Sequence, residues 1–335
     1  MKTGDIVQDK ACLVCGDTNR EIVATLGRGF VPLTTGLCGG CGLVSHTPMP
    51  DAEEVHAFYA KKYRLDYKGG YEPKRKHSLR AIRGAAARAK RVAAYLPTGA
   101  RVLDIGASSG EFTYVMNRAG FQATGIEPNQ GYAAFARRAY GVDIVNAPLE
   151  EAGVGDAAFD LITLNHVFEH LVDPFEALTM IRRWLKPSGL LFIEVPNLEG
   201  VRKQVTHTFH YAHIWNFTPQ TLVATLEKAG FTPLPDQDLK GTSIIFAATG
   251  AMDLAHSVKL PGLAQRLKAQ FREEQSTLAY VLSGAPIHRR WARLLRNIDE
   301  LQTVRRYPTV QAMAVAIVEA ARITPSGTLP KQKAA

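Results

Sequence analysis

The sequence predicts an α/β protein built around a parallel sheet, and three stretches carry this prediction. Residues 101–110 read RVLDIGASSG, in which an apolar run enters a turn bounded by Gly106 and Gly110. Residues 111–120 then place apolar side chains at helical spacing and end at a glycine. Residues 122–127, QATGIE, form a second short apolar run that ends in an acid. Strand, glycine turn, helix and strand in this order are typical of a parallel sheet with crossover helices.

The rest of the central region continues this alternation. The sequence KPSG at 186–189 is expected to form a turn, and 243–249 is a late β-rich segment. Further helices are expected at 131–140, 174–185 and 219–229, and further strands at about 143–146, at 159–164 and at 190–195.

The glycine turn and the acid after the second strand indicate a ligand site. Such a turn lets a ligand lie against bare backbone beside a helix N-terminus. A carboxylate at Glu127 can accept hydrogen bonds from both hydroxyls of a ribose. The loop lacks the G-x-G-x-x-G pattern of nicotinamide-binding Rossmann folds, which disfavours that class.

Five motifs follow one another from Arg101 to about Asn197 and in one later segment. They are LDIGASSG (103–110), GIEP (125–128), FDLITLNHVFEHL (159–171), LKPSGLLFIEVPN (185–197) and HIWNFTPQTLVATLEKAGF (213–231). With these motifs in this order, the chain resembles the class I S-adenosylmethionine-dependent methyltransferases. The resemblance implies a Rossmann-like core of seven strands, the last inserted antiparallel, with S-adenosylmethionine as methyl donor.

The resemblance also implies a donor site. In it Asp104 lies near the methionine amino group, Glu127 holds the ribose, and Ser108 stands where the family's loop often has a glycine. An acid that often binds the adenine amine in the family is missing or displaced here. The expected donor-site residues are Asp104, Gly106, Ala107, Ser108, Gly110, Glu127, Pro128, Asn146, Ala147, Leu149, Asn165 and His166.

All four cysteines lie in the first 41 residues, as two C-x-x-C pairs. Paired thiolates at this spacing can close a tetrahedral zinc site, and neighbouring glycines suit the tight turns. Short strands at 21–26 and 30–33 would complete a zinc ribbon. We expect a structural Zn²⁺ held by Cys12, Cys15, Cys38 and Cys41, because four thiolates leave no open position for catalysis.

Two segments join the ribbon to the core. Residues 51–60 resemble a capped helix and are followed by tyrosines at every fourth position, Tyr59 to Tyr71. This segment is either a lid over the ligand pocket or a half-buried helix face. Residues 74–95 form a basic helix, whose charge indicates either a solvated face or a binding site for a diphosphate or an RNA backbone.

Composition limits the remaining classes. The chain has 335 residues, a hydrophobic fraction of 46% and a net charge of +9, so a globular protein with acidic partners is expected. No apolar run is long enough to span a membrane and the N-terminus lacks a signal-peptide core, so we expect a cytoplasmic protein.

The chain is expected to contain four units. They are a zinc ribbon (1–60), a basic linker or lid (61–96), the donor-binding domain (97–250) and a helical extension (251–335). The extension is expected to pack on the core or on a second subunit in a homodimer, or to cap the substrate.

His166 to His170 also match H-x-x-E-H, the signature of inverted zinc peptidases. That motif requires a helix with two histidine ligands, whereas this stretch directly follows a buried strand. We therefore expect no catalytic zinc here, and interpret Glu169 and His170 as a hydrogen-bonded pair that fixes the loop.

Methyl transfer from a sulfonium requires alignment of the acceptor and, where necessary, removal of its proton. Histidine titrates near neutrality and can take that proton. The loop before the helix at 219–229 is the usual acceptor side of the fold. The candidates for the base are His213, His166, His210 and His170, with Tyr211 as a possible orienting group.

The ribbon followed by this core is similar to bacterial C-methyltransferases of nucleotide-linked deoxysugars. Their Tyr-x-Glu-His stretch corresponds to residues 210–213, where His213 matches and Ala212 replaces the glutamate. We expect O- or C-methylation of a small, phosphorylated or nucleotide-linked acceptor. The alternative is an rRNA methyltransferase, which the few cations of residues 11–50 disfavour.

Overall fold

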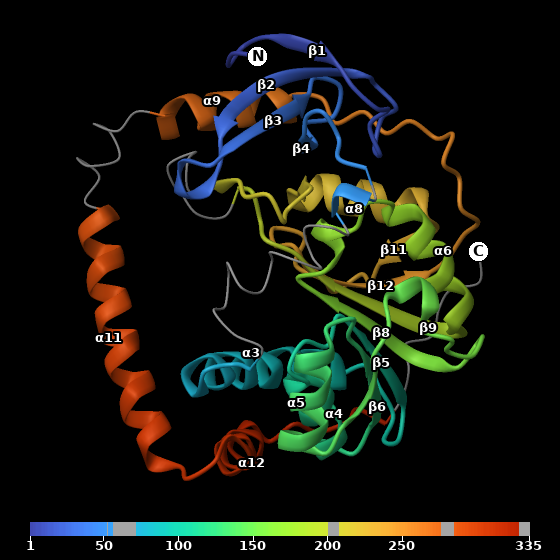
Figure 1. Cartoon of the computed structure of the whole chain (residues 1–335). Helices are drawn as coiled ribbons and strands as arrows, with labels where there is room; N and C mark the ends of the chain where they lie inside the picture. Colours follow the sequence, from blue (N-terminus) through green and yellow to red (C-terminus); the bar gives the residue numbers. More distant parts are fainter. Residues whose placement is uncertain (52, 56–71, 200–207, 276–284, 328–335) are drawn as a thin grey trace.

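A computed structural model describes residues 1–51, 53–55, 72–199, 208–275 and 285–327. The tyrosine repeat Tyr59 to Tyr71 and most of the helix expected at 51–60 lie outside the described residues. Figure 1 shows the sheet of the core at the centre, the N-terminal strands on one side of it, and the last helices at the periphery.

The core is a seven-stranded sheet in the order β11-β12-β9-β8-β5-β6-β7. Strands β5 to β9 pair in parallel, whereas β12 lies antiparallel between β9 and β11. This confirms the seven-stranded fold with one inserted antiparallel strand. The strands are β5 (Arg101–Ile105), β6 (Gln122–Ile126), β7 (Asp143–Val145), β8 (Phe159–Asn165), β9 (Leu185–Glu194), β11 (Phe231–Pro233) and β12 (Ser243–Ala248).

Helices cover both faces of this sheet, because successive residues of its strands point to opposite sides. Val102 and Leu161 pack with the cluster formed by one set of helices, whereas Leu103 and Ile162 pack with the other. The first set is α3 (Arg75–Ala93), α4 (Glu111–Arg118) and α5 (Gln130–Tyr140), and the second is α6 (Pro174–Trp184) and α8 (Pro219–Lys228).

The turn expected at 186–189 is not a break between elements, because β9 begins at Leu185 and runs through it. The pairing jumps from Phe159–Leu185 to Leu161–Leu190, so the KPSG residues bulge out of the ladder. Lys186 is held there by Asp160, with its Nζ 2.7 Å from Oδ2. A bulge and an ion pair thus replace the expected turn.

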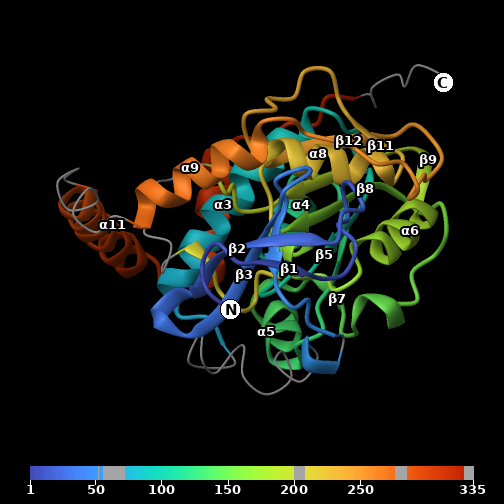
Figure 2. The same ribbon diagram turned by 90° about the horizontal axis from the view of Figure 1, so that it is seen from above.

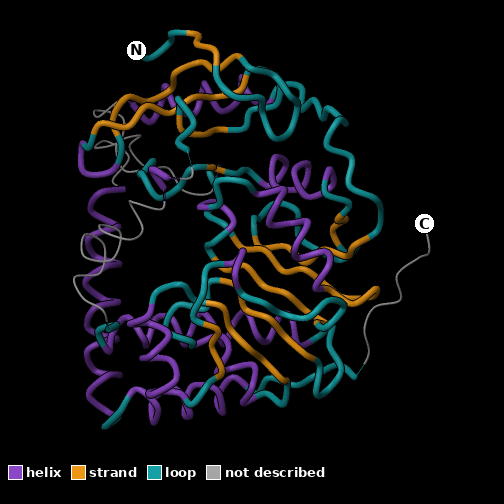
Figure 3. Tube along the Cα trace, turned by 45° about the vertical axis from the view of Figure 1, so that its right-hand side comes forward, coloured by secondary structure: helices purple, strands orange, loops and turns teal. Residues whose placement is uncertain are grey.

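The N-terminal sheet has the order β1-β2-β3-β4-β10, and Figure 3 shows it as a separate layer. Its hairpin is longer than expected, with a short 3-10 turn, Arg28–Phe30, between the strands. The fifth strand, β10, comes from the core region and pairs with β4. The strands are β1 (Ile6–Gln8), β2 (Asn19–Leu26), β3 (Pro32–Cys38), β4 (Val44–His46) and β10 (Trp215–Asn216).

The three C-terminal helices occupy different parts of the molecule. In Figures 1 and 2, α9 (Leu263–Gln275) lies along the N-terminal sheet, and its Leu267 and Phe271 join the core of that sheet. Helix α12 (Val310–Ala321) packs on α3, whereas α11 (Ala285–Arg306) stands at the edge of the molecule. Within the described residues, every helix is too short or too polar to span a membrane.

Candidate functional site

The site lies where the carboxyl ends of β5, β6, β8 and β9 meet. Between β5 and α4, Gly106 (φ +70°), Ser108 (φ +51°) and Gly110 (φ +83°) all have left-handed backbone. A Cβ at Gly106 would collide with Val167, and one at Gly110 would lie 2.7 Å from the Cβ of Ala136. The glycines are therefore required by the turn and its packing, and Ser108 occupies a conformation that favours glycine.

Glu127 follows β6 and is 2% exposed. Its Oε2 accepts the backbone N–H of Ser108 at 2.9 Å, and its Oε1 accepts that of Asn129 at 2.8 Å. These bonds fix the carboxylate against the glycine turn, and its contact with a ribose stays a prediction.

Asp104 in β5 is also 2% exposed, but side chains surround it. Its Oδ1 accepts hydrogen bonds from Thr163 Oγ1 at 2.7 Å and from Asn165 Nδ2 at 3.2 Å. Burial raises the pKa of Asp104 to about 6, although these two donors favour the ionised form. A buried acid of this kind is suited to pair with a bound cation.

The residues expected near adenine lie at the ends of β6 and β7. The side-chain amide of Asn146 donates to the carbonyl oxygens of Glu127 at 2.8 Å and of Pro128 at 3.1 Å. Asn146 therefore ties the two strand ends together. Leu149 is buried beside it and Ala147 is half-buried, which gives this end of the site an apolar wall.

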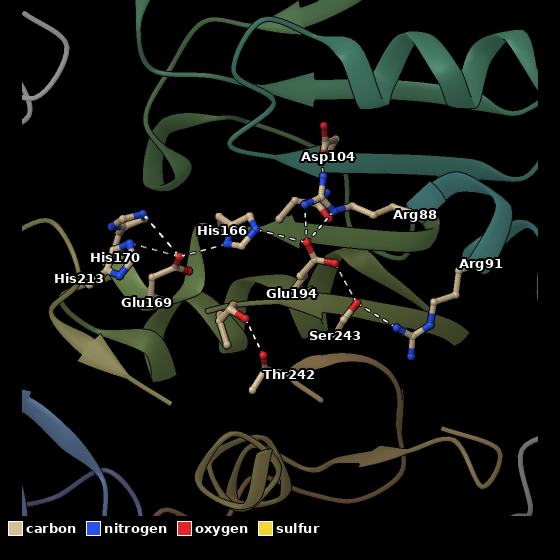
Figure 4. A network of polar contacts seen from close by, with 12 residues as sticks. Arg88, Arg91, Asp104, His166, Glu169, His170, Glu194, His213, Thr242 and Ser243 are labelled. Atoms are coloured by element: carbon tan, nitrogen blue, oxygen red, sulfur yellow. Dashed lines mark hydrogen bonds and ion pairs between the residues drawn. The ribbon is translucent and has the colours of Figure 1, made fainter. Parts of the chain in front are cut away.

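Histidines gather on the other side of the strand ends around Glu169, as Figure 4 shows. Oε1 of Glu169 lies 3.6 Å from His166 Nδ1 and 3.8 Å from both His170 Nε2 and His213 Nε2. The rings of His210 and His213 pack together at a tilt of 48°, with their centroids 3.6 Å apart. The expected Glu169–His170 hydrogen bond is absent, since Nδ1 of His170 instead contacts the carbonyl of Ala212.

The charge states within this cluster differ. Partial burial opposes the charged ring of His166, but the carboxylates of Glu169 and Glu194 raise its pKa to about 9. Burial and the neighbouring histidines lower the pKa of His213. Burial likewise raises the cost of a charge on Glu194, but His166 and Arg88 outweigh it and hold the pKa of Glu194 below its usual range.

Sequence reasoning missed two residues of this site. His46 in β4 is buried, its ring lies 5.6 Å from that of Tyr211, and burial lowers its pKa to about 4. Glu194 ends β9 and links His166 to Arg88 of α3 (Figure 4). The rule that selected Glu127, an acid after a buried strand, also applies to Glu194. No comparable signal marked His46.

The basic helix α3 uses much of its charge inside the chain. Arg88 Nε donates to Glu194 Oε1 at 2.9 Å, and Arg91 donates to Ser243 Oγ at 2.9 Å. Arg83 pairs with Asp299 of α11 at 2.6 Å, and Arg80 pairs with Glu300. These four arginines therefore hold neighbouring elements.

The four cysteines meet at one point of the N-terminal module. The Sγ atoms of Cys12 and Cys41 are 3.4 Å apart, as are those of Cys15 and Cys38. All four Sγ atoms lie within 4.8 Å of one another, and the cysteines form no disulfide. Sulfur ligands 2.3 Å from a tetrahedral zinc are about 3.8 Å apart, so this donor set fits the ion.

This module is attached directly to the core. The buried Lys228 of α8 donates from Nζ to the carbonyl of Leu13 at 2.8 Å, beside the first cysteine pair. Pairing of β4 with β10 links the module to the segment that carries His210 and His213. The four-cysteine module therefore supports the histidine side of the site.

The central part of the chain matches known methyltransferases. Residues 76–235 match the model of a family described as methyltransferase domain. The C-methyltransferase NovU of Streptomyces niveus is 29% identical over 181 residues, which cover 51% of this chain and 42% of NovU. A ubiquinone biosynthesis O-methyltransferase of a Ruegeria species is 28% identical over 159 residues, which cover 43% of this chain and 63% of the relative.

One solved structure of a methyltransferase covers about two thirds of the chain. The 1,6-didemethyltoxoflavin-N1-methyltransferase of Burkholderia thailandensis gives a TM-score of 0.46 at 22% identity, covering 68% of this chain and 100% of that one.

The chain therefore contains a methyltransferase domain, similar to those of C- and O-methyltransferases. It spans 42% of NovU and 63% of the Ruegeria enzyme.

Proposed function

We propose that this protein transfers the methyl group of S-adenosylmethionine to an oxygen or carbon atom of a small acceptor. A phosphorylated or nucleotide-linked sugar, or another intermediate of natural-product or cell-surface glycan synthesis, fits this proposal. The observation that carries it is the continuity of the two halves of the site. Asn165 donates to Asp104 on the donor side, and the next residue, His166, contacts Glu169 of the histidine cluster.

In this proposal the donor lies along the carboxyl ends of the strands. Glu127 would accept the ribose hydroxyls, and Asp104 would face the methionine ammonium. Leu149 and Ala147 would line the adenine pocket. The methyl group would then point toward His166 and the histidine cluster, because that side lies beyond the methionine end of the donor.

The chemistry is an in-line displacement. A lone pair of the acceptor atom forms a bond to the methyl carbon while the carbon–sulfur bond breaks, and S-adenosylhomocysteine leaves. The acceptor's proton passes to a base, for which His213 is the first candidate and His210, His170 and His166 are alternatives. Tyr211 would orient the acceptor. Position and proton removal are the two contributions required from the protein.

A small acceptor is favoured over RNA because several basic groups of α3 and of the N-terminal module are engaged within the chain. Four arginines of α3 contact other parts of the chain. In the N-terminal module, the guanidinium of Arg20 is buried and donates to the carbonyls of Lys10, Asp17 and Asn19. RNA binding depends on accessible cations.

We further propose that the four cysteines hold a structural Zn²⁺. Its part would be to fold the N-terminal module, whose β4 pairs with the strand after His213. The ion would then act on the acceptor side only by keeping that segment in place.

The donor half is tested by calorimetric titration with S-adenosylmethionine. Glu127→Ala removes the carboxylate and should weaken binding by roughly 10- to 100-fold, the value of one or two charge-assisted hydrogen bonds. Asp51→Ala, an exposed acid at the end of the N-terminal module, serves as the control. Unchanged affinity in a folded Glu127→Ala variant would exclude Glu127 from the site.

The acceptor half is tested by transfer of labelled methyl groups to nucleotide-linked sugars, with an rRNA transcript as the competing substrate. His213→Ala should lower turnover by about 10²- to 10⁴-fold, the range for a general base, with donor affinity little changed. Wild-type turnover in this variant would remove His213 from the mechanism. Methylation of the transcript alone would replace the small acceptor by RNA.

A further inference from the structure

The carboxylate of Glu169 is the most unusual group in the described part of the chain. Its side chain is 1% exposed, and neither of its oxygens makes a hydrogen bond to a described residue. Imidazole nitrogens of His166, His170 and His213 surround Oε1 at 3.6–3.8 Å, as the dashed lines of Figure 4 show. A buried carboxylate in this position requires cations among its neighbours, and the ring of His166, whose pKa is raised, reaches it only from the more exposed side.

His170 cannot supply a hydrogen bond to Glu169 in its neutral form. Its Nδ1 contacts the carbonyl oxygen of Ala212, which can only accept, so Nδ1 carries the hydrogen. The lone pair of Nε2 then points toward the Glu169 carboxylate. A histidine that donates one ring nitrogen to a carbonyl and presents the other to an anionic group has the orientation of a metal ligand.

We propose that Glu169, His170 and His213 form a binding site for a divalent transition-metal ion such as Zn²⁺. One atom from each side chain lies within 4.8 Å of the other two. Bonds of about 2.1 Å to a tetrahedral ion place ligands about 3.4 Å apart, which small rotations of the three side chains provide. Two imidazoles and a carboxylate suit zinc and its neighbours, and leave a fourth position open.

This site differs from the inverted peptidase motif that the sequence contains. His166, the first histidine of that motif, is 48% exposed and its Nε2 lies 3.3 Å from Glu194. It therefore stands outside the ligand set. Glu169 is here a ligand and not a base, and the third ligand, His213, comes from the segment before β10. The proposed site therefore lacks peptidase geometry, but it departs from the expectation that no catalytic zinc lies at this stretch.

The role of the ion rests on the proposed function, whereas its presence does not. On the acceptor side of the donor, a bound cation would hold an acceptor oxygen and lower its pKa. His170 and His213 would then act as ligands, since a metal-bound Nε2 has no lone pair left to accept a proton, and the base would be one of the other two candidates, His210 or His166. Metal content measures the site without reference to activity, so failure of one proposal leaves the other standing.

The first test is metal analysis of the full chain after saturation with Zn²⁺ and removal of loosely bound ion. Two equivalents per chain are expected, one at the cysteines and one at Glu169. Glu169→Gln and His213→Ala should each lose one equivalent. His288→Ala, which changes an exposed histidine on α11, should keep both.

Cobalt distinguishes the two sites spectroscopically. Loading with Co²⁺ should give thiolate charge-transfer absorption from the cysteine site, and a second Co²⁺ should add only the weak bands of nitrogen and oxygen ligands. His213→Ala should retain the first signal and weaken the second binding event by roughly 100-fold or more. His213→Ala serves as the decisive variant if Glu169→Gln does not fold.

Two results would overturn the proposal. One is a single equivalent in the wild type that shows only thiolate ligation at every Co²⁺ concentration below 1 mM, on the order of the weakest specific sites. The other is a wild-type second equivalent that folded Glu169→Gln and His213→Ala variants retain. Either result would mean that a proton or water satisfies Glu169.

Discussion

At the residue scale, the two buried acids of the proposed donor site differ in the groups that hold them. Backbone N–H groups hold Glu127, so its position depends on the conformation of the glycine turn. Side chains of β8 hold Asp104, whose charge is therefore sensitive to its burial.

Asp104 gives a pH-dependent prediction. Its pKa is raised to about 6, above the ordinary value of an aspartate, because it is buried. The ammonium of the donor pairs with the ionised form, so donor affinity should fall as the pH drops below about 6, by up to tenfold per pH unit. Calorimetry with S-adenosylhomocysteine between pH 5 and 7.5, roughly the range in which this group titrates, measures the effect.

The control for this prediction is Asp104→Asn, which keeps the shape and cannot ionise. It should bind more weakly at neutral pH and lose the pH dependence. The free energy of unfolding should depend on pH in the opposite direction to donor affinity. Because the carboxyl pKa of Asp104 is raised in the folded protein, it contributes stability at low pH that is lost as the pH rises from about 4 to about 6. An unchanged pH slope in Asp104→Asn would contradict the role of Asp104.

The same scale shows which site residues the sequence could reveal. Glu127 was predicted as an acid that follows a short apolar strand beside a glycine turn, and Asp104 was predicted from the resemblance to the methyltransferases. His213 was predicted from its place in the loop before a helix. His46 could not be predicted, because its approach to Tyr211 depends on pairing between strands that lie far apart in the sequence.

At the scale of elements, the start of α4 shows why the turn contains Gly110. This residue is the N-cap, has φ +83°, and leaves a Cβ only 2.7 Å from Ala136. Gly99, with φ +77°, has the same backbone handedness and no neighbouring atom within 4 Å of such a Cβ. Substitutions at these two glycines therefore distinguish the effect of backbone strain alone from that of strain combined with steric overlap.

Gly99→Ala should lower the free energy of unfolding by about 1–2 kcal/mol, the cost of a left-handed non-glycine residue. Gly110→Ala should lower it by a further 1–3 kcal/mol, about the cost of overpacking a core contact. Urea unfolding of both variants measures the difference. Equal losses in the two variants would contradict the packing described for Gly110.

Elements with local signals were predicted, and those that depend on tertiary contacts were not. The period of apolar residues predicted α5, α6 and α8 closely. Strand β10 has only two residues, and it exists because Trp215 and Asn216 pair with β4. The bulge at 186–189 likewise depends on pairing with β8, so its sequence alone resembles a turn.

At the scale of the whole molecule, the four-cysteine module and the core share one hydrophobic cluster. Cys12, Val14 and Leu43 belong to the same cluster as Ile105 and Phe217. Helix α9, which lies near the C-terminal end of the sequence, packs against the strands of the module. The module is therefore part of the structure that holds the acceptor side, which accounts for its position next to His210 and His213.

The most direct test of the central claim is a crystal structure with S-adenosylhomocysteine. The ribose hydroxyls should lie on Glu127, the amino group should face Asp104, and the sulfur should point toward His166 and the cluster around Glu169. A product bound away from the glycine turn would contradict the donor site. A sulfur facing away from the histidines would contradict the acceptor site that the proposed reaction requires.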